Sequence, residues 1–136
     1  MLHRINDLLS HNKNFAFETT LATKIYKNKI LAAQQVGYSV SLLFFWLQNI
    51  ELAKERVNTR VKEGGHNIMP EIIERRYIKG IKYLFDLYLP IVDGALIFDN
   101  SKGKHELIAE KQNTGNFKII NSKAFKLLKK YHEDNP

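Results

Sequence analysis

The sequence predicts an α/β domain built around a parallel sheet, and two observations support this prediction. Short apolar segments of strand length alternate with longer segments of helical periodicity. The segment 38–47 is almost entirely apolar, a pattern typical of a strand that is buried on both faces of a parallel sheet. A chain of 136 residues fits one domain, so we expect residues 1–136 to fold as a single unit. Because parallel sheets carry helices on both faces, this unit is expected to have three layers.

The N-terminal half is expected to contain three helices and two strands. In order, these are a helix over 2–9, a strand over 14–18, a helix from 19 or 20 to 36, the strand 38–47 and a helix after residue 49. The ends follow from local signals. Thr19 or Thr20 and Asn49 can cap the helices that follow them, and Gly37 suits the position just beyond a helix end.

The C-terminal half is expected to add two helices, one strand and a hairpin. In order, these are a helix from 70 to about 89, a strand over 95–98, a hairpin of 107–110 and 117–120, and a helix from 122. Pro70 fits the first position of a helix, and Pro90 ends that helix. The turn of the hairpin falls at residues 113–115.

Composition narrows the classes of function. The chain has no cysteine, which excludes disulfides and thiolate zinc sites and makes a reducing cytoplasm the expected compartment. No apolar run approaches the ~20 residues that span a bilayer, so no membrane partner is expected. The net charge is +7 and the C-terminal excess is all lysine. Charge alone permits a basic nucleic-acid-binding module, but we find no recognition motif for one.

Two arginine-rich helices are expected to flank a loop that contains Gly64 and Gly65. This pattern suggests an anion clamp that closes over phosphates, because guanidinium groups are planar, always charged and bidentate. The residues that could form it are Arg56, Arg60, His66, Arg75 and Arg76. Arg76 falls beside the apolar stripe of its helix, so we expect it to face inward and to need a carboxylate or a phosphate as partner. The alternative is two amphipathic helices with solvated charges.

Polar residues also follow the carboxyl ends of the expected strands, and ligands of open α/β sheets bind beyond these ends. They lie at 18–20, at 46–48 and at 99–100. Glu18 could accept a hydrogen bond from a substrate hydroxyl, and Thr20 could add a donor. The alternative is that the threonines only cap a helix whose first turn holds Glu18. No pair of histidines has metal-ligand spacing, so no metal site is expected.

Four segments together resemble the C-terminal two-thirds of the zeta-toxin-like P-loop kinases. They are Phe15-Ala-Phe-Glu-Thr-Thr20, the strand 40–47, Arg60-Val-Lys-Glu-Gly-Gly-His66 and Pro70-Glu-Ile-Ile-Glu-Arg-Arg-Tyr77. The chain is most similar to the bacterial branch described as predicted ABC-type ATPases. The resemblance implies a P-loop-kinase-like fold and the transfer of a phosphoryl group from ATP, with Mg²⁺, to a hydroxyl of a small molecule or nucleotide sugar. In the best-known toxins that acceptor is UDP-N-acetylglucosamine, and an antitoxin is a further partner.

The resemblance also assigns roles by position. Glu18 and Thr20 match the acceptor-binding motif, Arg60 matches a lid arginine that contacts ATP phosphates, and Arg76 is a candidate for a second. The toxins have an arginine two residues after the threonine, whereas Ala22 stands here, which puts the sugar-nucleotide acceptor and toxicity in doubt.

The chain lacks the Gly-x-x-x-x-Gly-Lys-Ser/Thr loop and the catalytic aspartate that follows it in this family. We therefore expect neither tight binding of ATP and Mg²⁺ nor kinase activity from this chain alone. Without the P-loop strand, either 14–18 pairs directly with 40–46 or apolar edges stay open and favour self-association. A non-catalytic protein-binding role is the main alternative function.

Overall fold

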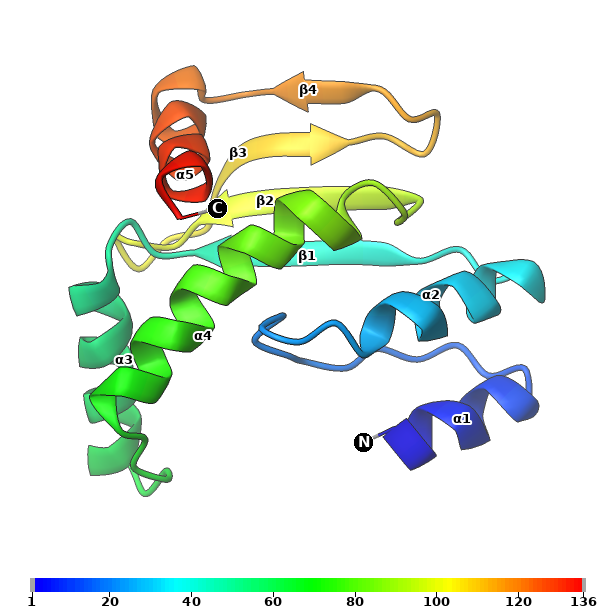
Figure 1. Cartoon of the computed structure of the whole chain (residues 1–136), viewed down its shortest axis with the longest axis horizontal. Helices are drawn as coiled ribbons and strands as arrows, with labels where there is room; N and C mark the ends of the chain where they lie inside the picture. Colours follow the sequence, from blue (N-terminus) through cyan, green and yellow to red (C-terminus); the bar gives the residue numbers. More distant parts are fainter. Residues whose placement is uncertain (1, 136) are drawn as a thin grey trace.

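A four-stranded mixed sheet forms the centre of the computed structural model, which describes residues 2–135 (Figure 1). The helices are α1 (Leu2–Ser10), α2 (Tyr26–Gln35), α3 (Ile50–Lys62), α4 (Pro70–Tyr83), the π-helical turn η1 (Leu84–Tyr88) and α5 (Ser122–Asp134). The strands are β1 (Ser41–Trp46), β2 (Gly94–Asp99), β3 (Glu106–Lys111) and β4 (Phe117–Ile119). The α/β class predicted from the sequence is confirmed.

The strand order β1-β2-β3-β4 combines one parallel pair with one hairpin. β1 and β2 are parallel, with Ser41 opposite Gly94 and Trp46 opposite Asp99. β3 and β4 then add antiparallel, and the register shifts between Ile97 and Phe98. Parallel pairing is thus confirmed for β1 and β2, but the sheet as a whole is mixed because the predicted hairpin joins it.

Helix starts follow the local signals in the second half of the chain. The Oδ1 atom of Asn49 accepts a hydrogen bond from the backbone N–H of Leu52 at 2.9 Å and caps α3. Asn121 caps α5 in the same way, at 3.1 Å from the N–H of Ala124. Pro70 begins α4 as predicted. These caps satisfy N–H groups that a helix cannot pair internally.

The predicted strand over 14–18 is wrong. These residues pair with no strand, and their alternating aromatic rings instead pack on side chains around α2. The ring of Phe15 lies 6.3 Å from that of Tyr38, and the ring of Phe17 lies 5.1 Å from that of Tyr26. The alternation of apolar side chains therefore reflects two aromatic anchors rather than a sheet register.

The helix predicted from Thr19 or Thr20 begins later, at Tyr26. The hydroxyl of Thr19 accepts a hydrogen bond from the N–H of Leu21 at 3.1 Å and forms a tight turn instead of a helix cap. Leu21 has a φ of 62°, which a helix cannot contain. The hydroxyl of Tyr88 donates to the backbone carbonyl of Thr23 and ties this loop to η1.

The three-layer arrangement predicted from the sequence is also wrong, because α4 and α5 cross the same face of the sheet (Figure 1). α3 packs against α4 beyond the carboxyl ends of β1 and β2. On the helix-covered face Trp46 and Ile97 are fully buried. On the other face Leu43 and Phe45 remain 55% and 48% exposed. β1 was predicted to be buried on both faces, and it is an edge strand buried on one.

The carboxylate of Asp86 in η1 connects this turn to α5. Nε2 of His132 lies 2.7 Å from Oδ1 of Asp86, and Nζ of Lys82 lies 3.3 Å from Oδ2. The hydrogen bond from His132 is the main cause that holds the pKa of Asp86 below its ordinary value. A lowered pKa in the folded state means that ionised Asp86 stabilises the fold, and that this contribution is lost as the pH falls through the folded pKa.

Asp86→Asn is therefore expected to lower the free energy of unfolding at neutral pH and to have little effect in acid. The difference in the free energy of unfolding between wild type and Asp86→Asn should be largest above the ordinary carboxyl pKa of about 4. It should shrink as the pH falls below that value. Urea unfolding at pH 7, 5 and 3 measures this difference. Asp134→Asn is the matched control on α5, and a pH-independent effect of Asp86→Asn would contradict the assignment.

Candidate functional site

The carboxyl ends of β1 and β2 meet around a buried carboxylate, Asp99, which is only 5% exposed. Its Oδ2 accepts a hydrogen bond from Nε2 of Gln48 at 2.7 Å. Its Oδ1 accepts from the backbone N–H of Ser101 at 3.0 Å and from the Ser101 hydroxyl at 2.5 Å. The Ser101 Oγ in turn accepts from the N–H of Gln48 at 2.9 Å. These four bonds tie the ends of two parallel strands together.

The sequence analysis looked for a site at the polar residues 18–20, 46–48 and 99–100, and the structure brings 46–48 and 99–100 together at one edge of the sheet. The roles of Gln48 and Ser101 were missed. An aspartate two residues before a serine, at the end of a buried strand, is a recognisable turn signal, because the carboxylate can accept from the backbone N–H two residues on. Asn100 adds an Oδ1 that is buried and accepts no hydrogen bond from any described residue.

Tyr77 of α4 closes this network from the helix side. Its hydroxyl donates to the backbone carbonyl of Leu47 at 2.6 Å and lies 3.2 Å from Nε1 of Trp46, which donates to it. Burial raises the pKa of Tyr77 far above its ordinary value, so the hydroxyl stays neutral. The ring of Tyr131 packs against it at 5.6 Å. Tyr77 therefore holds α4 on the strand end and cannot serve as a base there.

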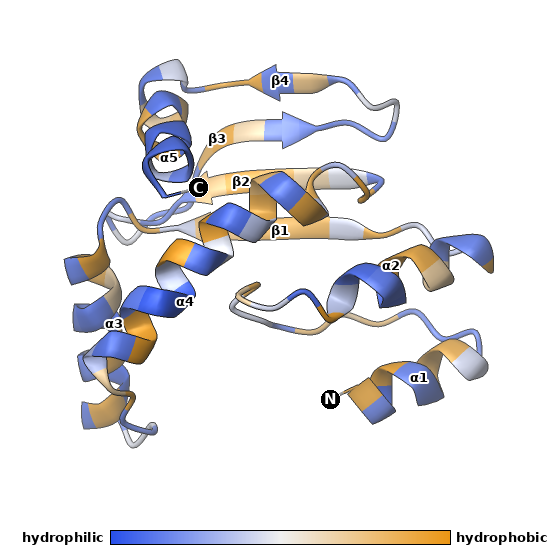
Figure 2. Cartoon of the chain, viewed as in Figure 1, coloured by the Kyte–Doolittle hydropathy of each residue, from blue (hydrophilic) through white to orange (hydrophobic). Residues whose placement is uncertain are grey.

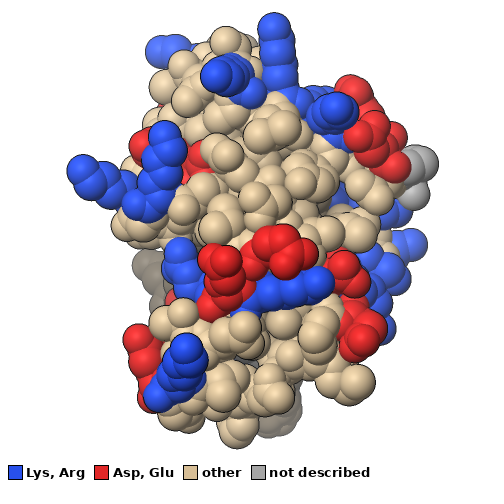
Figure 3. Space-filling view, turned by 90° about the vertical axis from the view of Figure 1, so that its left-hand side faces the viewer, with Lys and Arg blue, Asp and Glu red and all other residues tan. Residues whose placement is uncertain are grey.

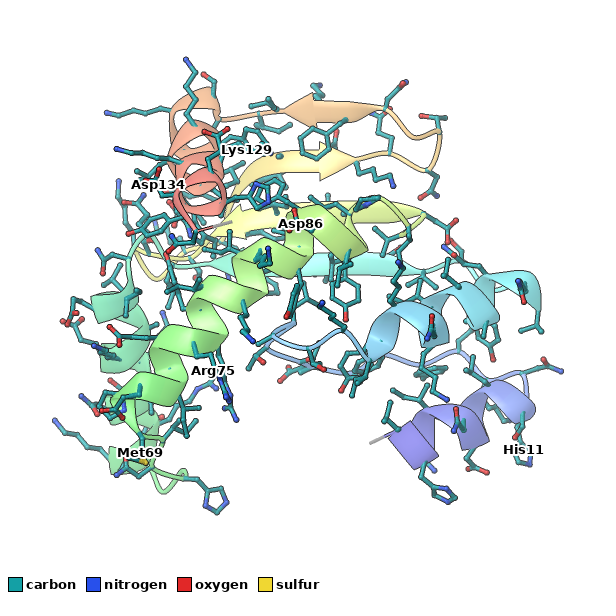
Figure 4. The ribbon with its side chains drawn as sticks, in the orientation of Figure 1. His11, Met69, Arg75, Asp86, Lys129 and Asp134 are labelled. Carbon is teal, nitrogen blue, oxygen red and sulfur yellow. The ribbon has the colours of Figure 1, made fainter. Side chains whose placement is uncertain are left out.

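The arginines predicted to bind phosphate all lie on α3 and α4, and each is exposed. They are Arg56 and Arg60 on α3 and Arg75 and Arg76 on α4. No ion pair joins any of the four to a carboxylate within residues 2–135. Figure 4 shows Arg75 extending from α4 away from the sheet. The inward orientation predicted for Arg76 is wrong, because the buried stripe of α4 runs through Ile73 and Ile81 and leaves position 76 in solvent.

Charges of both signs lie on the α3–α4 pair. Nζ of Lys54 lies 3.7 Å from a carboxylate oxygen of Glu51 and 3.5 Å from one of Glu74. Figure 3 views the molecule from the side on which α3 lies and shows acidic and basic groups interleaved there. Any anion site on this pair would therefore depend on individual guanidinium groups and not on a uniform positive field.

The two glycines between these helices end α3. The N–H of Gly64 donates to the carbonyl of Val61 at 3.0 Å, and that of Gly65 donates to the carbonyl of Arg60 at 2.6 Å. This is the Schellman arrangement, with Gly64 at a φ of 98° where a side chain would be strained. A Cβ on Gly65 would lie 2.8 Å from the carbonyl oxygen of Arg60. Both glycines are therefore required by the backbone, and His66 follows them in solvent.

Glu18 and Thr20 lie on the loop that packs against the C-terminal part of α4, and both are exposed. A Cβ on Gly80 would lie 2.8 Å from the carbonyl oxygen of Thr20, so the loop backbone touches the helix there. Arg76 lies one turn before Gly80 on the same face of α4. The fold thus brings Arg76 toward the loop that carries Glu18 and Thr20.

Arg60 and His66 lie toward the other end of α4. Pro70 and Gly80 are about 15 Å apart along a helix of this pitch. Arg60 lies near the end of α3 and His66 in the loop before Pro70, so both belong to the N-terminal side of α4, whereas the loop of Thr20 touches Gly80. Described residues include no group of three or more His, Asp or Glu side chains that could hold a metal ion. Over the same residues, no helix is long and apolar enough to cross a membrane.

No family model matches the chain, and no solved structure matches it. An uncharacterized protein of Haemophilus influenzae (strain ATCC 51907 / DSM 11121 / KW20 / Rd) is 32% identical over 63 residues. That match covers 46% of this chain and 45% of the relative, so the chain matches less than half the length of that protein.

Proposed function

We propose that this chain supplies the lid and the acceptor-binding side of an ATP-dependent, P-loop-kinase-like phosphotransferase. Its acceptor would be a hydroxyl group of a small molecule or a nucleotide sugar. The observation that carries the proposal is the set of four exposed arginines on α3 and α4, none of which has a carboxylate partner among the described residues. Unpaired guanidinium groups are available to an anion from solution.

The position of these helices supports the same function. α3 begins four residues after β1 ends, and the α3–α4 pair extends beyond the carboxyl ends of the parallel strands (Figure 1). Ligands of open α/β sheets bind beyond those ends. Glu74, which precedes Arg75 in the sequence, lies 3.5 Å from Nζ of Lys54 instead. Among residues 2–135, no carboxylate oxygen lies within ion-pair distance of Arg75 or Arg76 on α4.

On the acceptor side, Arg76 and the loop of Glu18 and Thr20 approach each other across Gly80. An ionised Glu18 would accept a hydrogen bond from an acceptor hydroxyl, and the Thr20 hydroxyl would donate a second. Both side chains are exposed and able to do so.

The positive charge of the exposed arginines suits the phosphates of ATP, but the residues present do not form a complete nucleotide site. The chain has no Gly-x-x-x-x-Gly-Lys-Ser/Thr loop, whose amides and lysine would hold Mg²⁺-bound ATP in position for transfer. We therefore assign to this chain the binding and orientation of the phosphates and the acceptor, and not the transfer step itself.

The proposal predicts weak, localised binding of polyphosphates to α3 and α4. Titration of the ¹⁵N-labelled chain with inorganic tripolyphosphate, and separately with ATP, should shift the signals of Arg56, Arg60, Arg75 and Arg76 with a dissociation constant on the order of 1 mM. Arg60→Ala should weaken this binding by about fivefold, since a charge-assisted contact is worth roughly 1 kcal/mol at an exposed site. Stability should not change, because Arg60 is exposed.

A matched control is Lys126→Ala, which removes an exposed charge from α5. If tripolyphosphate and ATP shift no signal of α3 or α4, the proposal is wrong. If the shifts instead fall on the lysines of α5, and duplex DNA binds there with a steep dependence on salt, a nucleic-acid-binding module replaces it.

A further inference from the structure

Strand β1 has an unpaired edge. β2 is its only partner strand among residues 2–135. The carbonyls of Val40 and Trp46 point toward β2, because they accept from the N–H groups of Asp93 at 2.9 Å and Asn100 at 2.8 Å. Backbone groups alternate in direction along a strand, so the N–H and C=O groups of positions 41, 43 and 45 point toward the open edge.

The same positions carry apolar side chains on the uncovered face of the sheet. Leu43 is 55% exposed and Phe45 is 48% exposed. Phe45 stacks on Phe98 of β2 at 5.2 Å, and the ring of His105 lies 4.9 Å from it. An extended segment that paired with the edge would therefore also find an apolar strip beside it.

Nothing in β1 protects this edge. Native edge strands usually carry a lysine, a proline or a bulge that blocks pairing with another chain. No charged residue occurs between Lys29 and Glu51, and no proline occurs there either. The irregular pairing of this sheet lies between Ile97 and Phe98 and leaves β1 regular. Figure 2 likewise shows no strongly hydrophilic residue along β1.

Segments that carry lysines adjoin both ends of β1. At the start, the hydroxyl of Tyr38 donates to the backbone carbonyl of Lys13 at 2.8 Å. At the end, Lys102 and Lys104 follow Ser101, whose hydroxyl accepts from the N–H of Gln48. Residues 1–40, which include the segments beside β1, hold five basic and two acidic side chains, a balance of +3 (5 − 2).

We propose that the β1 edge binds an extended segment of an acidic partner protein, which adds as a fifth strand next to β1. Backbone hydrogen bonds to positions 41, 43 and 45 hold the segment, and alternating apolar side chains of the partner cover Leu43 and Phe45. Acidic residues that flank the segment lie near the lysine-bearing segments that adjoin the two ends of β1. The partner is a heterologous chain rather than a second copy, because two copies would bring like charges of +7 together.

The test uses a synthetic peptide in which valine and threonine alternate and glutamates flank both ends. Amide hydrogen exchange of the full chain is measured with and without this peptide. The N–H groups of Leu43 and Phe45 should exchange at least about tenfold more slowly when the peptide is bound, because they gain hydrogen bonds. The N–H groups of Leu42 and Phe44 face β2 and should change little. A peptide with lysines in place of the glutamates should bind about tenfold more weakly.

Leu43→Lys should weaken peptide binding by about tenfold or more while leaving the melting temperature nearly unchanged, because the side chain is mostly exposed. Leu127→Lys, at an α5 position that is 40% exposed, is the matched control and should bind normally. Three results would each overturn the proposal: no protection of Leu43 and Phe45 by the peptide, equal binding of the two peptides, or protection without peptide that grows with protein concentration. The last would assign the edge to a second copy.

Discussion

Replacement of Asp99 by alanine is expected to lower the free energy of unfolding by about 3 kcal/mol, which for a domain of this size is a fall of about 10 °C in melting temperature. Asp99 is 5% exposed and accepts three hydrogen bonds, two from Ser101 and one from Gln48. Alanine removes all three and leaves the donors of Gln48 and Ser101 without an acceptor. Alanine also removes the desolvation cost of the buried carboxylate, but this gain offsets only part of the loss.

Asp99→Asn is the informative control. The asparagine keeps one carbonyl oxygen for the two donors of Ser101. Its amide nitrogen then faces Gln48, whose side chain can turn its own oxygen toward it. We therefore expect a loss of only about 1 kcal/mol for Asp99→Asn. Thermal unfolding measures both variants. Equal melting temperatures for wild type and Asp99→Ala would show that the network does not stabilise the strand ends.

Local sequence signals predicted the second half of the fold well. Asn49 and Pro70 mark helix starts because their effects act within one turn of the chain. The hairpin β3–β4 turns where Gly115 takes a φ of 90°. Each of these features depends on a few neighbouring residues, so a single sequence is enough to find it.

Features that depend on distant partners were not predicted. Phe15 and Phe17 alternate as strand residues do, and only the placement of Tyr26 and Tyr38 shows that they anchor a loop. The apolar strand β1 gives no signal that a whole face is uncovered, because an edge strand and a central strand of this composition look alike in sequence. These errors concern tertiary placement rather than local conformation.

The candidate site shows the same division. Polar residues after β1 and β2 could be expected to meet, because parallel strands end at one edge. The contact between Thr20 and Gly80 could not be expected, since it joins a loop and a helix 60 residues apart (80 − 20). Arg76 was placed inward because it adjoins Tyr77 in sequence, whereas its exposure depends on where α4 meets the sheet.

Gly80→Ala is expected to destabilise the fold by about 2 kcal/mol, against the usual effect of this substitution. Within a helix, replacing glycine by alanine normally stabilises by about 0.5–1 kcal/mol. Here the added Cβ would lie 2.8 Å from the carbonyl oxygen of Thr20, which is a backbone atom. Overpacking of this kind costs about 1–3 kcal/mol when the neighbour cannot move aside.

The loop has little freedom to yield to the added Cβ. Leu21 is 5% exposed, with a φ of 62°, and the carbonyl of Thr23 accepts from Tyr88, which is fully buried. Displacement of Thr20 would therefore disturb contacts on the core side. Lys79→Ala, at the neighbouring exposed position of α4, is the matched control and should change the melting temperature by no more than about 2 °C. A higher melting temperature for Gly80→Ala would mean that the loop moves freely, and the approach of Glu18 and Thr20 to Arg76 would then lose its structural basis.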